Sequence, residues 1–328
     1  MNKFFVIING GKGDTWSSNI WSDISDEAII YLDNIITSNR LLKMLNKLHF
    51  SNKINSIINL PFKNVWKRLL PIQESDIAEF DNTYIIFQSN VKFPPKYLKY
   101  LKGKYGCKVI LYLPDTVEKL GIAKNVDQFS RYVRKNCIDL CFSFDPKDCQ
   151  KFDLIFFDIY SKVVYDCDNI VRNDLFYVGN CRNKNRLNIL LNVFEACRNY
   201  VNSELYLFGV DLQQQKYSNK IRYNKYLPYN TVINKILSSN CILELVNENQ
   251  IGNTLRFKEA ICYNKKLLTT NKNVINSKYY NENYIRMFTN IDEIDKEWIS
   301  KREKVDYGYS GEFSPKALLN MIEKLVNN

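Results

Sequence analysis

The sequence is poor in the groups that build metal sites and disulfide frameworks. Its 328 residues include one histidine, His49, and nine cysteines with no CxxC pair. Zinc sites draw on clustered cysteine and histidine, so this chain offers little for one. An odd number of cysteines cannot all pair internally, which favours a reducing compartment. No apolar run reaches the length that spans a bilayer, and Phe4 to Ile8 is too short for a signal-peptide core.

Acidic residues are missing from two long stretches of the first half. Asn34 to Gln73 holds seven Lys or Arg and no acid, and Asn82 to Pro114 holds six lysines and no acid. The whole chain has 46 basic and 35 acidic residues and a net charge of +11. Such an excess suits nucleic acid, anionic lipid or phosphate-bearing ligands. The abundance of Asn, Lys and Ile also fits a base bias of the genome, which weakens the charge argument.

Runs of β-type apolar residues alternate with helical patterns along most of the chain, as in parallel sheets flanked by helices. With 45% apolar residues, the chain is large enough for two cores. In the first half we expect strands at Phe4–Ile8, Asn55–Leu60, Tyr84–Gln88 and Lys108–Leu113. In the second half, strands at 174–180, 204–210, 241–246 and 266–270 alternate with helices at 186–201, 229–240 and 254–264.

The polar stretch Tyr165–Asp174 separates the two halves. We therefore expect an α/β protein with two Rossmann-like domains, residues 1–168 and 169–312, which face each other across a cleft. The tail, residues 313–328, is expected to form a helix that crosses back to the first domain. Ser314 as N-cap and Pro315 at the first helical position mark where this helix begins.

The segment Gly252 to Glu259 joins a predicted strand to a predicted helix, where open parallel sheets bind ligands. Gly252 allows a tight turn, and Asn253 or Thr254 can cap a helix whose free N–H groups attract an anion. Arg256 adds a guanidinium suited to phosphate. Glu259 lies about 7.5 Å further along the helix axis, a suitable distance from a phosphate to a ribose diol. The alternative is a plain turn and a surface ion pair between Arg256 and Glu259.

Four segments of the sequence resemble bacterial glycosyltransferases of the GT-B fold that make capsular polysaccharide and lipopolysaccharide. ILELVNENQIGNTLRFKEAICYNKKLLTTN is similar to their nucleotide-sugar half, FYVGNCRNKNRLNILLNVFEA to the opening of that half, and VILYLPDTVEKL with IDLCFSFDPKDCQKF to their first half. The similarity covers about residues 105 to 295. One departure is that Ile251 stands eight residues before Glu259, where the family commonly has a second glutamate; Glu244 and Glu248 come earlier.

The resemblance implies a hexosyltransferase (EC 2.4) that moves a sugar from a nucleotide-sugar donor, most simply a UDP-sugar, to a growing cell-surface glycan or lipid-linked saccharide. It implies no metal and no further cofactor. In the second domain, which would bind the donor, Gly252, Asn253, Thr254 and Arg256 would face the diphosphate and Glu259 the ribose.

The resemblance also implies that Lys184 and Arg186 neutralise the leaving diphosphate, which agrees with the charge that develops on the departing oxygens. A solvated loop is the alternative for this pair. Tyr229, within Lys225–Asn230, either stacks on the nucleotide base or belongs to the core.

The acceptor is expected on the first domain, beside the glycine-rich loop that follows Phe4–Ile8. This loop lacks the GxxxxGK[ST] spacing of a phosphate-binding Walker loop. Gly10, Gly11 and Gly13 would let it approach a sugar, and Asp14 could take the proton of the acceptor hydroxyl.

Asp115, at the end of another predicted strand, is the second candidate for this base. A reaction that retains anomeric configuration needs no protein base, and Asp14 then becomes a binding residue. We expect His49 to be a surface histidine rather than a catalytic base.

A basic amphipathic pattern runs through the acid-free stretch, with Leu41, Leu42, Met44, Leu45 and Leu48 on one helical face and Arg40, Lys43 and Lys47 around it. Such a helix could rest on an anionic membrane, or it could be an ordinary domain helix with a basic rim. We expect a cytoplasmic protein, which lies at the inner face of the plasma membrane if this helix rests on a membrane.

Two other classes of protein stay open. One is a catalytically silent GT-B partner subunit. The other is a basic nucleic-acid-binding protein, but the sequence has no zinc-finger, RNP or KH signature, so we expect no nucleic-acid partner.

Overall fold

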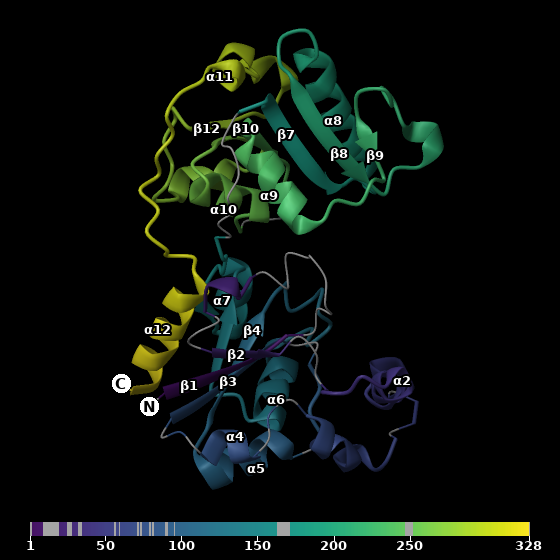
Figure 1. Ribbon diagram of the computed structural model, residues 1–328, viewed down its shortest axis with the longest axis vertical. Coiled ribbons are helices and arrows are strands. Elements are labelled where there is room, and N and C mark those ends of the chain that lie inside the picture. Colours follow the sequence, from purple (N-terminus) through teal and green to yellow (C-terminus); the bar gives the residue numbers. More distant parts are fainter. Residues whose placement is uncertain are drawn as a thin grey trace. The chain divides into compact units, whose positions relative to one another are not determined.

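The computed structural model divides into two compact α/β units, Met1–Ile159 and Tyr160–Asn328 (Figure 1). It describes residues 2–8, 20–24, 28–31, 35–55, 57–58, 60–70, 72, 74–78, 80, 82–88, 91–94, 96–162, 171–246 and 252–327. The boundary predicted between residues 168 and 169 lies outside the described residues.

The first unit is built on a parallel six-stranded sheet in the order β2-β1-β3-β4-β5-β6. Because β1 lies between β2 and β3, the sheet reverses its direction of growth there, which makes the carboxyl end of β1 a topological switch point. The strands are β1 (Asn2–Ile7), β2 (Ala28–Tyr31), β3 (Asn82–Gln88), β4 (Lys108–Leu113), β5 (Leu140–Ser143) and β6 (Ile155–Phe156).

Apolar side chains cover both faces of this sheet, as the unbroken apolar runs predict. Phe4 to Ile8 is buried throughout, and α5 packs Leu98 and Leu101 into the same core. Gly106 ends α5 in the left-handed conformation, with φ 66°, and its N–H bonds to the Lys102 carbonyl. The described helices of the unit are α2 (Arg40–His49), α3 (Asn52–Asn55), α4 (Glu74–Ala78), α5 (Tyr97–Tyr105), α6 (Val126–Asn136), α7 (Pro146–Phe152) and the 3-10 helices η1 (Ser22–Ile24) and η2 (Lys63–Leu69).

The strand predicted at Asn55–Leu60 is wrong. Asn55 is the last residue of α3, and the amides of Ile57 and Ile58 both bond to the Ile54 carbonyl, continuing a helical turn. Ile57 and Ile58 are 84% and 63% exposed, so they join neither the sheet nor the core. The short strand β2 is absent from the sequence prediction.

The second unit has its own parallel sheet, in the order β12-β11-β10-β7-β8-β9. This is the Rossmann order, with its switch point between β7 and β10. The strands are β7 (Asn173–Asn180), β8 (Ser203–Phe208), β9 (Arg222–Tyr223), β10 (Ser239–Glu244), β11 (Lys266–Thr269) and β12 (Ile285–Met287).

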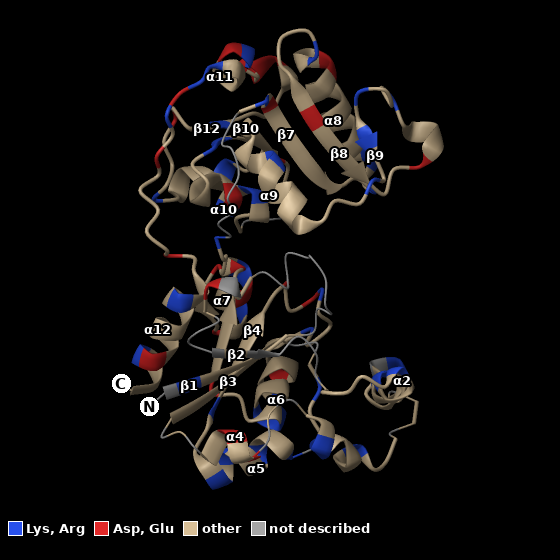
Figure 2. Cartoon of the chain, viewed as in Figure 1, with Lys and Arg blue, Asp and Glu red and all other residues tan. Residues whose placement is uncertain are grey.

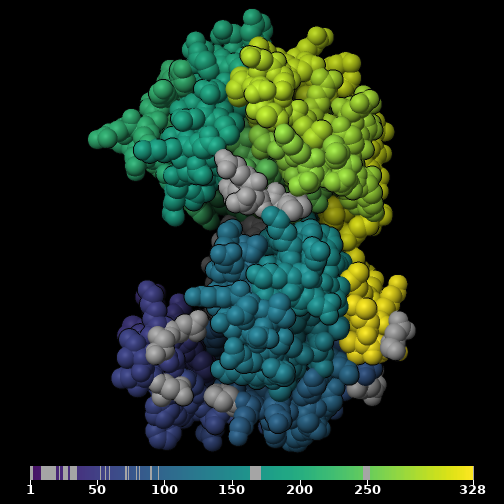
Figure 3. Space-filling model, turned by 180° about the vertical axis from the view of Figure 1, so that it is seen from behind, coloured from purple at the N-terminus to yellow at the C-terminus, as the bar shows by residue number. Residues whose placement is uncertain are grey.

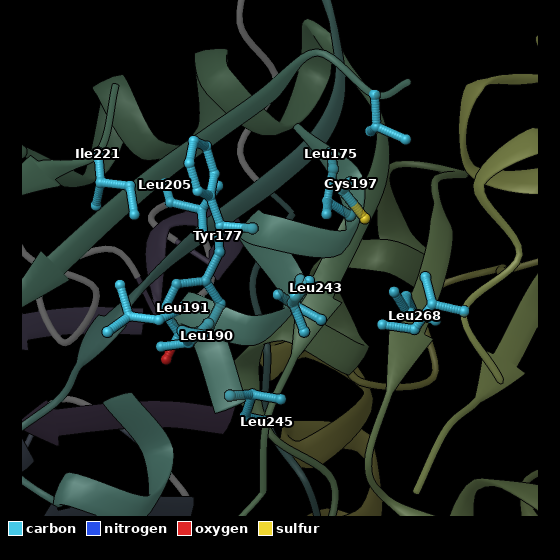
Figure 4. Close-up of a cluster of buried hydrophobic side chains, with 14 of the residues drawn as sticks. Leu175, Tyr177, Leu190, Leu191, Cys197, Leu205, Ile221, Leu243, Leu245 and Leu268 are labelled. Atoms are coloured by element: carbon cyan, nitrogen blue, oxygen red, sulfur yellow. The ribbon is translucent and has the colours of Figure 1, made fainter. Parts of the chain in front are cut away.

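Helix α8 packs on this sheet through Leu190 and Leu191, which lie among Leu175, Leu205 and Leu243 of the strands (Figure 4). This contact fixes the β7–α8 loop at one end of the sheet. The described helices of the unit are α8 (Lys184–Cys197), α9 (Tyr229–Leu237), α10 (Leu255–Cys262), α11 (Lys296–Ser300), α12 (Pro315–Asn327) and the 3-10 helices η3 (Leu212–Gln214), η4 (Lys272–Asn276) and η5 (Ile291–Glu293).

The start predicted for the C-terminal helix is confirmed. Pro315 is the first residue of α12, and the Ser314 hydroxyl accepts the Ala317 amide at 3.1 Å. That this helix crosses back to the first domain stays a prediction.

Candidate functional site

Two loops meet at the carboxyl ends of β7 and β10. The Arg186 guanidinium donates through Nη1 to the Asn180 carbonyl, at 3.3 Å, and through Nη2 to the Leu245 carbonyl, at 3.1 Å. Asn180 ends β7, and Leu245 follows the last residue of β10. Arg186 therefore ties the β7–α8 loop to the start of the segment that leads into α10.

The β7–α8 loop presents further positive charge beside a hollow. Asn183 caps α8 by accepting the Asn185 and Arg186 amides, and Arg182 and Lys184 are exposed on either side of this cap. The hollow has a volume of about 410 Å³ and is lined by Arg182, Lys184, Gly209, Val210, Asp211, Gln214 and Asn224.

Gly209 is needed in this hollow. It has φ 72°, and a Cβ there would come within 2.6 Å of Arg182 Cγ. The absence of a side chain therefore lets Arg182 lie across the end of β8. Sequence reasoning missed Arg182, although its alternation with Lys184 and Arg186 was a usable signal.

The amino end of α10 is anchored by a buried carboxylate. Thr254 caps the helix, accepting the Arg256 amide at 3.0 Å, and its hydroxyl donates to Glu244 Oε1. The Thr269 hydroxyl, at the end of β11, donates to Glu244 Oε2. Burial raises the pKa of Glu244, and the hydrogen bonds from Thr254 and Thr269 oppose that shift. Glu244 thus holds α10 against β10 and β11.

Glu259 is fully buried and lies in a polar network one turn further along α10. It forms an ion pair with Arg256, and the Tyr229 hydroxyl lies 3.2 Å from its Oε1. The Tyr229 hydroxyl also lies 3.1 Å from the Tyr160 hydroxyl, which in turn lies 3.4 Å from the Tyr263 hydroxyl. Burial raises the pKa of Glu259 to about 7, although Arg256 and Tyr229 favour the carboxylate.

The structure brings three of the predicted donor residues, Arg256, Glu259 and Tyr229, into direct contact. Gly252 is buried and Asn253 half-buried at the start of the same segment. The Tyr229 side chain is only 6% exposed, so its hydroxyl, and not its ring face, contributes to the network.

Sequence reasoning also missed Glu244 and Tyr160. Glu244 was noted only as an acid upstream of Glu259, although its place at the end of a predicted strand was a signal. Tyr160 gave no signal, because it is 69 residues from Tyr229 in the sequence.

On the first unit, Gly10, Gly11, Gly13 and Asp14 lie outside the described residues. Asp115 follows β4, accepts the Thr116 amide at 2.9 Å and pairs with Lys119 at 3.3 Å. Its side chain is 41% exposed, so solvent can reach it.

A more buried acid, Asp148, lies close to Asp115 and was not singled out from the sequence. It accepts the Val117 amide at 2.7 Å, and burial raises its pKa. Asp115 and Asp148 therefore flank the same turn after β4.

His49 has a structural role. Its Nδ1 accepts from Trp66 Nε1 at 2.8 Å, so Nε2 carries the proton and donates to the Pro61 carbonyl at 2.6 Å. Both ring nitrogens are thus engaged in holding α2 against the segment that includes η2.

In the part of the chain that the structure describes, no group of three His, Cys, Asp or Glu side chains could hold a metal ion. Among the same residues, no helix is long and apolar enough to cross a membrane.

No protein-family model and no curated protein matches the sequence. Among solved structures, HepE from Anabaena in complex with UDP aligns with a TM-score of 0.50 and 11% identity over 100% of both chains. HepE with UDP and glucose gives 0.48, 10% identity and 99% coverage of each chain. The glycotransferase of kitacinnamycin gives 0.44, 10% identity and 98% coverage of each.

The likeness to HepE with UDP shows the fold alone. The predicted α/β architecture, two Rossmann-like units of the GT-B type, is confirmed. The capsular and lipopolysaccharide branch of that fold class stays a prediction.

The anchoring role of Glu244 can be tested by unfolding. Glu244→Ala should lower the free energy of unfolding by about 3 kcal/mol, because it opens a cavity and removes the acceptor shared by Thr254 and Thr269. Glu244→Gln keeps the volume and one acceptor oxygen and should cost less than half as much. Urea titration followed by circular dichroism measures both.

The matched control is Glu195→Ala, which removes an exposed i,i+3 partner of Arg198. It should change the free energy of unfolding by about 0.5 kcal/mol or less. Equal losses for Glu244→Ala and Glu195→Ala would show that Glu244 anchors nothing.

The pKa of Glu259, raised from 4.5 to about 7, predicts a pH dependence of stability. The folded state holds this proton more tightly than the unfolded state does. The protonated Glu259 carboxyl therefore adds to the free energy of unfolding, fully below about pH 4.5, and this contribution is lost as the pH rises through about 7. Glu259→Gln should remove that loss. From pH 4.5 to pH 8, the free energy of unfolding of the variant should rise by on the order of 3 kcal/mol relative to that of wild type, as measured by urea titration. A constant difference between the two proteins contradicts this prediction.

Proposed function

We propose that the protein is a glycosyltransferase that uses a UDP-sugar donor. The observation that carries the proposal is the join, at the β7/β10 switch point, between the cationic β7–α8 loop and the segment that leads into α10. There Arg186 bonds to the Leu245 carbonyl, and Arg256 and Glu259 lie on the helix that follows. Positive charge at this end of the sheet, from Arg182, Lys184 and Arg256, is what a diphosphate needs. In Figure 2, blue marks the cations at α10, with red beside them.

Each group has a chemical role in this proposal. Breaking a glycosyl phosphate bond places negative charge on the departing diphosphate, and fixed cations and helix N–H groups lower that barrier. Arg256 and the capped start of α10 would hold the diphosphate from one side. Arg182 and Lys184, which line the hollow beside β7, would neutralise it from the other.

Glu259 would accept the ribose hydroxyls. For this, a ribose hydroxyl takes the place at Oε1 that the Tyr229 hydroxyl occupies, while Arg256 keeps its ion pair with the other oxygen. Because a carboxylate accepts hydrogen bonds better than a carboxylic acid, this contact is strongest above the Glu259 pKa of about 7.

UDP as the nucleotide is supported by HepE, whose structure was solved with UDP. The resemblance of the sequence to capsular and lipopolysaccharide enzymes supports a cell-surface glycan or lipid-linked saccharide as acceptor, and a cytoplasmic site of action. Asp14, in the loop after β1, and Asp115 are the proposed proton acceptors. In this proposal the chain's own cations take the part that a metal ion plays in other transferases.

A catalytically silent GT-B partner subunit is the second candidate. The burial of Glu259 favours it, because both carboxylate oxygens already have partners within the protein. A silent subunit would bind UDP weakly or not at all and would release none from UDP-sugars.

Calorimetric titration with UDP tests the donor site. Arg256→Ala should weaken UDP binding by about 10- to 100-fold, because it removes a charge-assisted contact. Lys184→Ala, a change at an exposed side chain, should weaken it by about tenfold without affecting the fold.

The control is Arg302→Ala, since Arg302 is exposed and ion-paired to Asp174 near the amino end of β7. It should leave UDP affinity unchanged. If Arg256→Ala and Lys184→Ala bind UDP as wild type does, the site is misassigned.

Release of UDP from a panel of UDP-sugars tests the absence of a metal requirement. Turnover after EDTA treatment should stay within about twofold of the untreated rate, because the cations that stabilise the leaving group belong to the chain. Loss of turnover that Mg²⁺ or Mn²⁺ restores would contradict this.

A further inference from the structure

Helix α2 turns its apolar face to solvent. Leu41, Met44, Leu45 and Leu48 recur at the i, i+3, i+4, i+7 spacing of a helix face that normally faces a core. Their side chains are 59%, 55%, 43% and 44% exposed, whereas the buried residue of the helix is the polar Asn46. The usual orientation of an amphipathic helix is therefore inverted.

The exposed apolar surface continues beyond α2. In the described part of the chain, seventeen large apolar side chains are exposed, and nine of them fall within a stretch of thirty residues. These nine, the apolar patch, are Ile36, Leu41, Met44, Leu45, Leu48, Ile57, Ile58, Phe62 and Val65. In the space-filling view this part of the chain is the projecting purple to dark-blue lobe of the first unit (Figure 3). Single exposed apolar residues are ordinary, but a concentration of this kind marks an interaction surface.

The patch lies within a stretch that has only positive charge. Residues 34–73 include seven Lys or Arg and no acid. Arg40 and Lys47 of α2 are both exposed, and Figure 2 shows α2 and the segment after it in tan and blue without red. Apolar side chains and cations are therefore offered together.

Specific contacts hold this stretch in shape. His49 joins α2 to Pro61 and Trp66 through its two ring nitrogens, and the Asn55 amide donates to the His49 carbonyl at 2.9 Å. Phe62 has φ 59°, a conformation that costs a bulky residue energy, while its side chain is 79% exposed. The apolar patch is thus displayed by a fixed scaffold.

We propose that the apolar patch and its basic rim dock the protein on a bilayer that contains anionic phospholipid. An amphipathic helix lies in the plane of a bilayer with its apolar face among the acyl chains and its cations at the headgroups. Each cation near an anionic surface adds about 1 kcal/mol, so several are needed to give stable binding along with the apolar contact. Both requirements are met within residues 36–68.

The charge of the patch decides against the two other occupants. A second copy of the chain would bring two acid-free surfaces together and leave their cations opposed. A nucleic acid would satisfy the cations, but it contacts phosphates through polar side chains and leaves the four exposed apolar residues of α2 uncovered. Of these three occupants, only a lipid surface supplies negative charge and an apolar layer at the same place.

This inference does not depend on the proposed function, because it rests on the surface of the first unit alone. Together, the two would place the acceptor-binding unit where a lipid-linked saccharide is found. The test therefore uses vesicles without donor or acceptor, and its result stands whatever sugar chemistry the protein performs.

Flotation of the full chain with phosphatidylcholine vesicles, with and without phosphatidylglycerol, measures the partition coefficient. We expect binding to the anionic vesicles only, weakened by salt. Leu41→Gln with Leu45→Gln should lower partition more than about tenfold. Arg40→Gln with Lys47→Gln should lower it about 30-fold at low salt, from two cations near the surface.

Matched pairs on the rest of the chain control for composition. Ile275→Gln with Leu325→Gln, and Lys124→Gln with Lys304→Gln, change exposed residues outside residues 36–68 and should leave partition unchanged. Because a loss can reflect misfolding, a gain is also measured. Leu45→Trp should show a blue-shifted emission on anionic vesicles, and Ile275→Trp should not.

Three results overturn the proposal. The first is equal partition of wild type and the Leu41→Gln, Leu45→Gln variant. The second is a concentration-dependent dimer in lipid-free solution that the same variant abolishes, which assigns the patch to a second copy. The third is binding to duplex DNA with none to anionic vesicles.

Discussion

The parallel pairing of β7 with β10 is the constraint on which the candidate site depends. Cys241 pairs with Leu175 and Ile242 with Phe176, so the two strands run side by side and end at the same edge of the sheet. Residues more than sixty positions apart, such as Asn180 and Glu244, are thereby brought to one place. Arg186 can bridge the loops only because this register sets the distance between them. No local property of either loop would produce the site without that pairing.

Buried charged side chains lie at both ends of the second unit's sheet, in different surroundings. Glu244 and Glu259 lie at the carboxyl edge, and burial raises the pKa of both. Lys266, at the start of β11, is fully buried at the opposite end, where it donates to the Trp298 and Lys301 carbonyls and pairs with Glu303 at 3.2 Å. Its ammonium group has two backbone carbonyls and one carboxylate as partners, as a buried charge with a structural role requires. Perturbed acids in a polar network beside exposed cations are instead typical of binding sites.

Sequence patterns predicted those parts of the fold that local chemistry decides. The strand predicted at Lys108–Leu113 is β4 to the residue, and Thr254, one of the two residues expected to cap α10, caps it. Patterns failed where a neighbour decides. The isoleucines at 57 and 58 have strand propensity but no strand beside them, so a helical turn takes precedence. Tyr160 is joined to Glu259 through Tyr229 only by the tertiary fold, and nothing in its own surroundings in the sequence indicates that contact.

The surface of the first unit also differs from what the apolar pattern of its sequence indicates. Apolar residues of the β1 run are buried on both faces of a sheet, which is how such side chains ordinarily contribute to stability. The nine residues of the apolar patch gain less from folding, because at least 43% of the surface of each is still exposed to water, and they raise the risk of aggregation. The hydrogen bond that His49 donates to Pro61 and the one that it accepts from Trp66 nevertheless hold the segment together around them. Polar contacts hold this segment in a conformation that leaves its apolar side chains exposed, and residues 34–73 contain no acid. Both features fit a partner surface that is apolar and negatively charged.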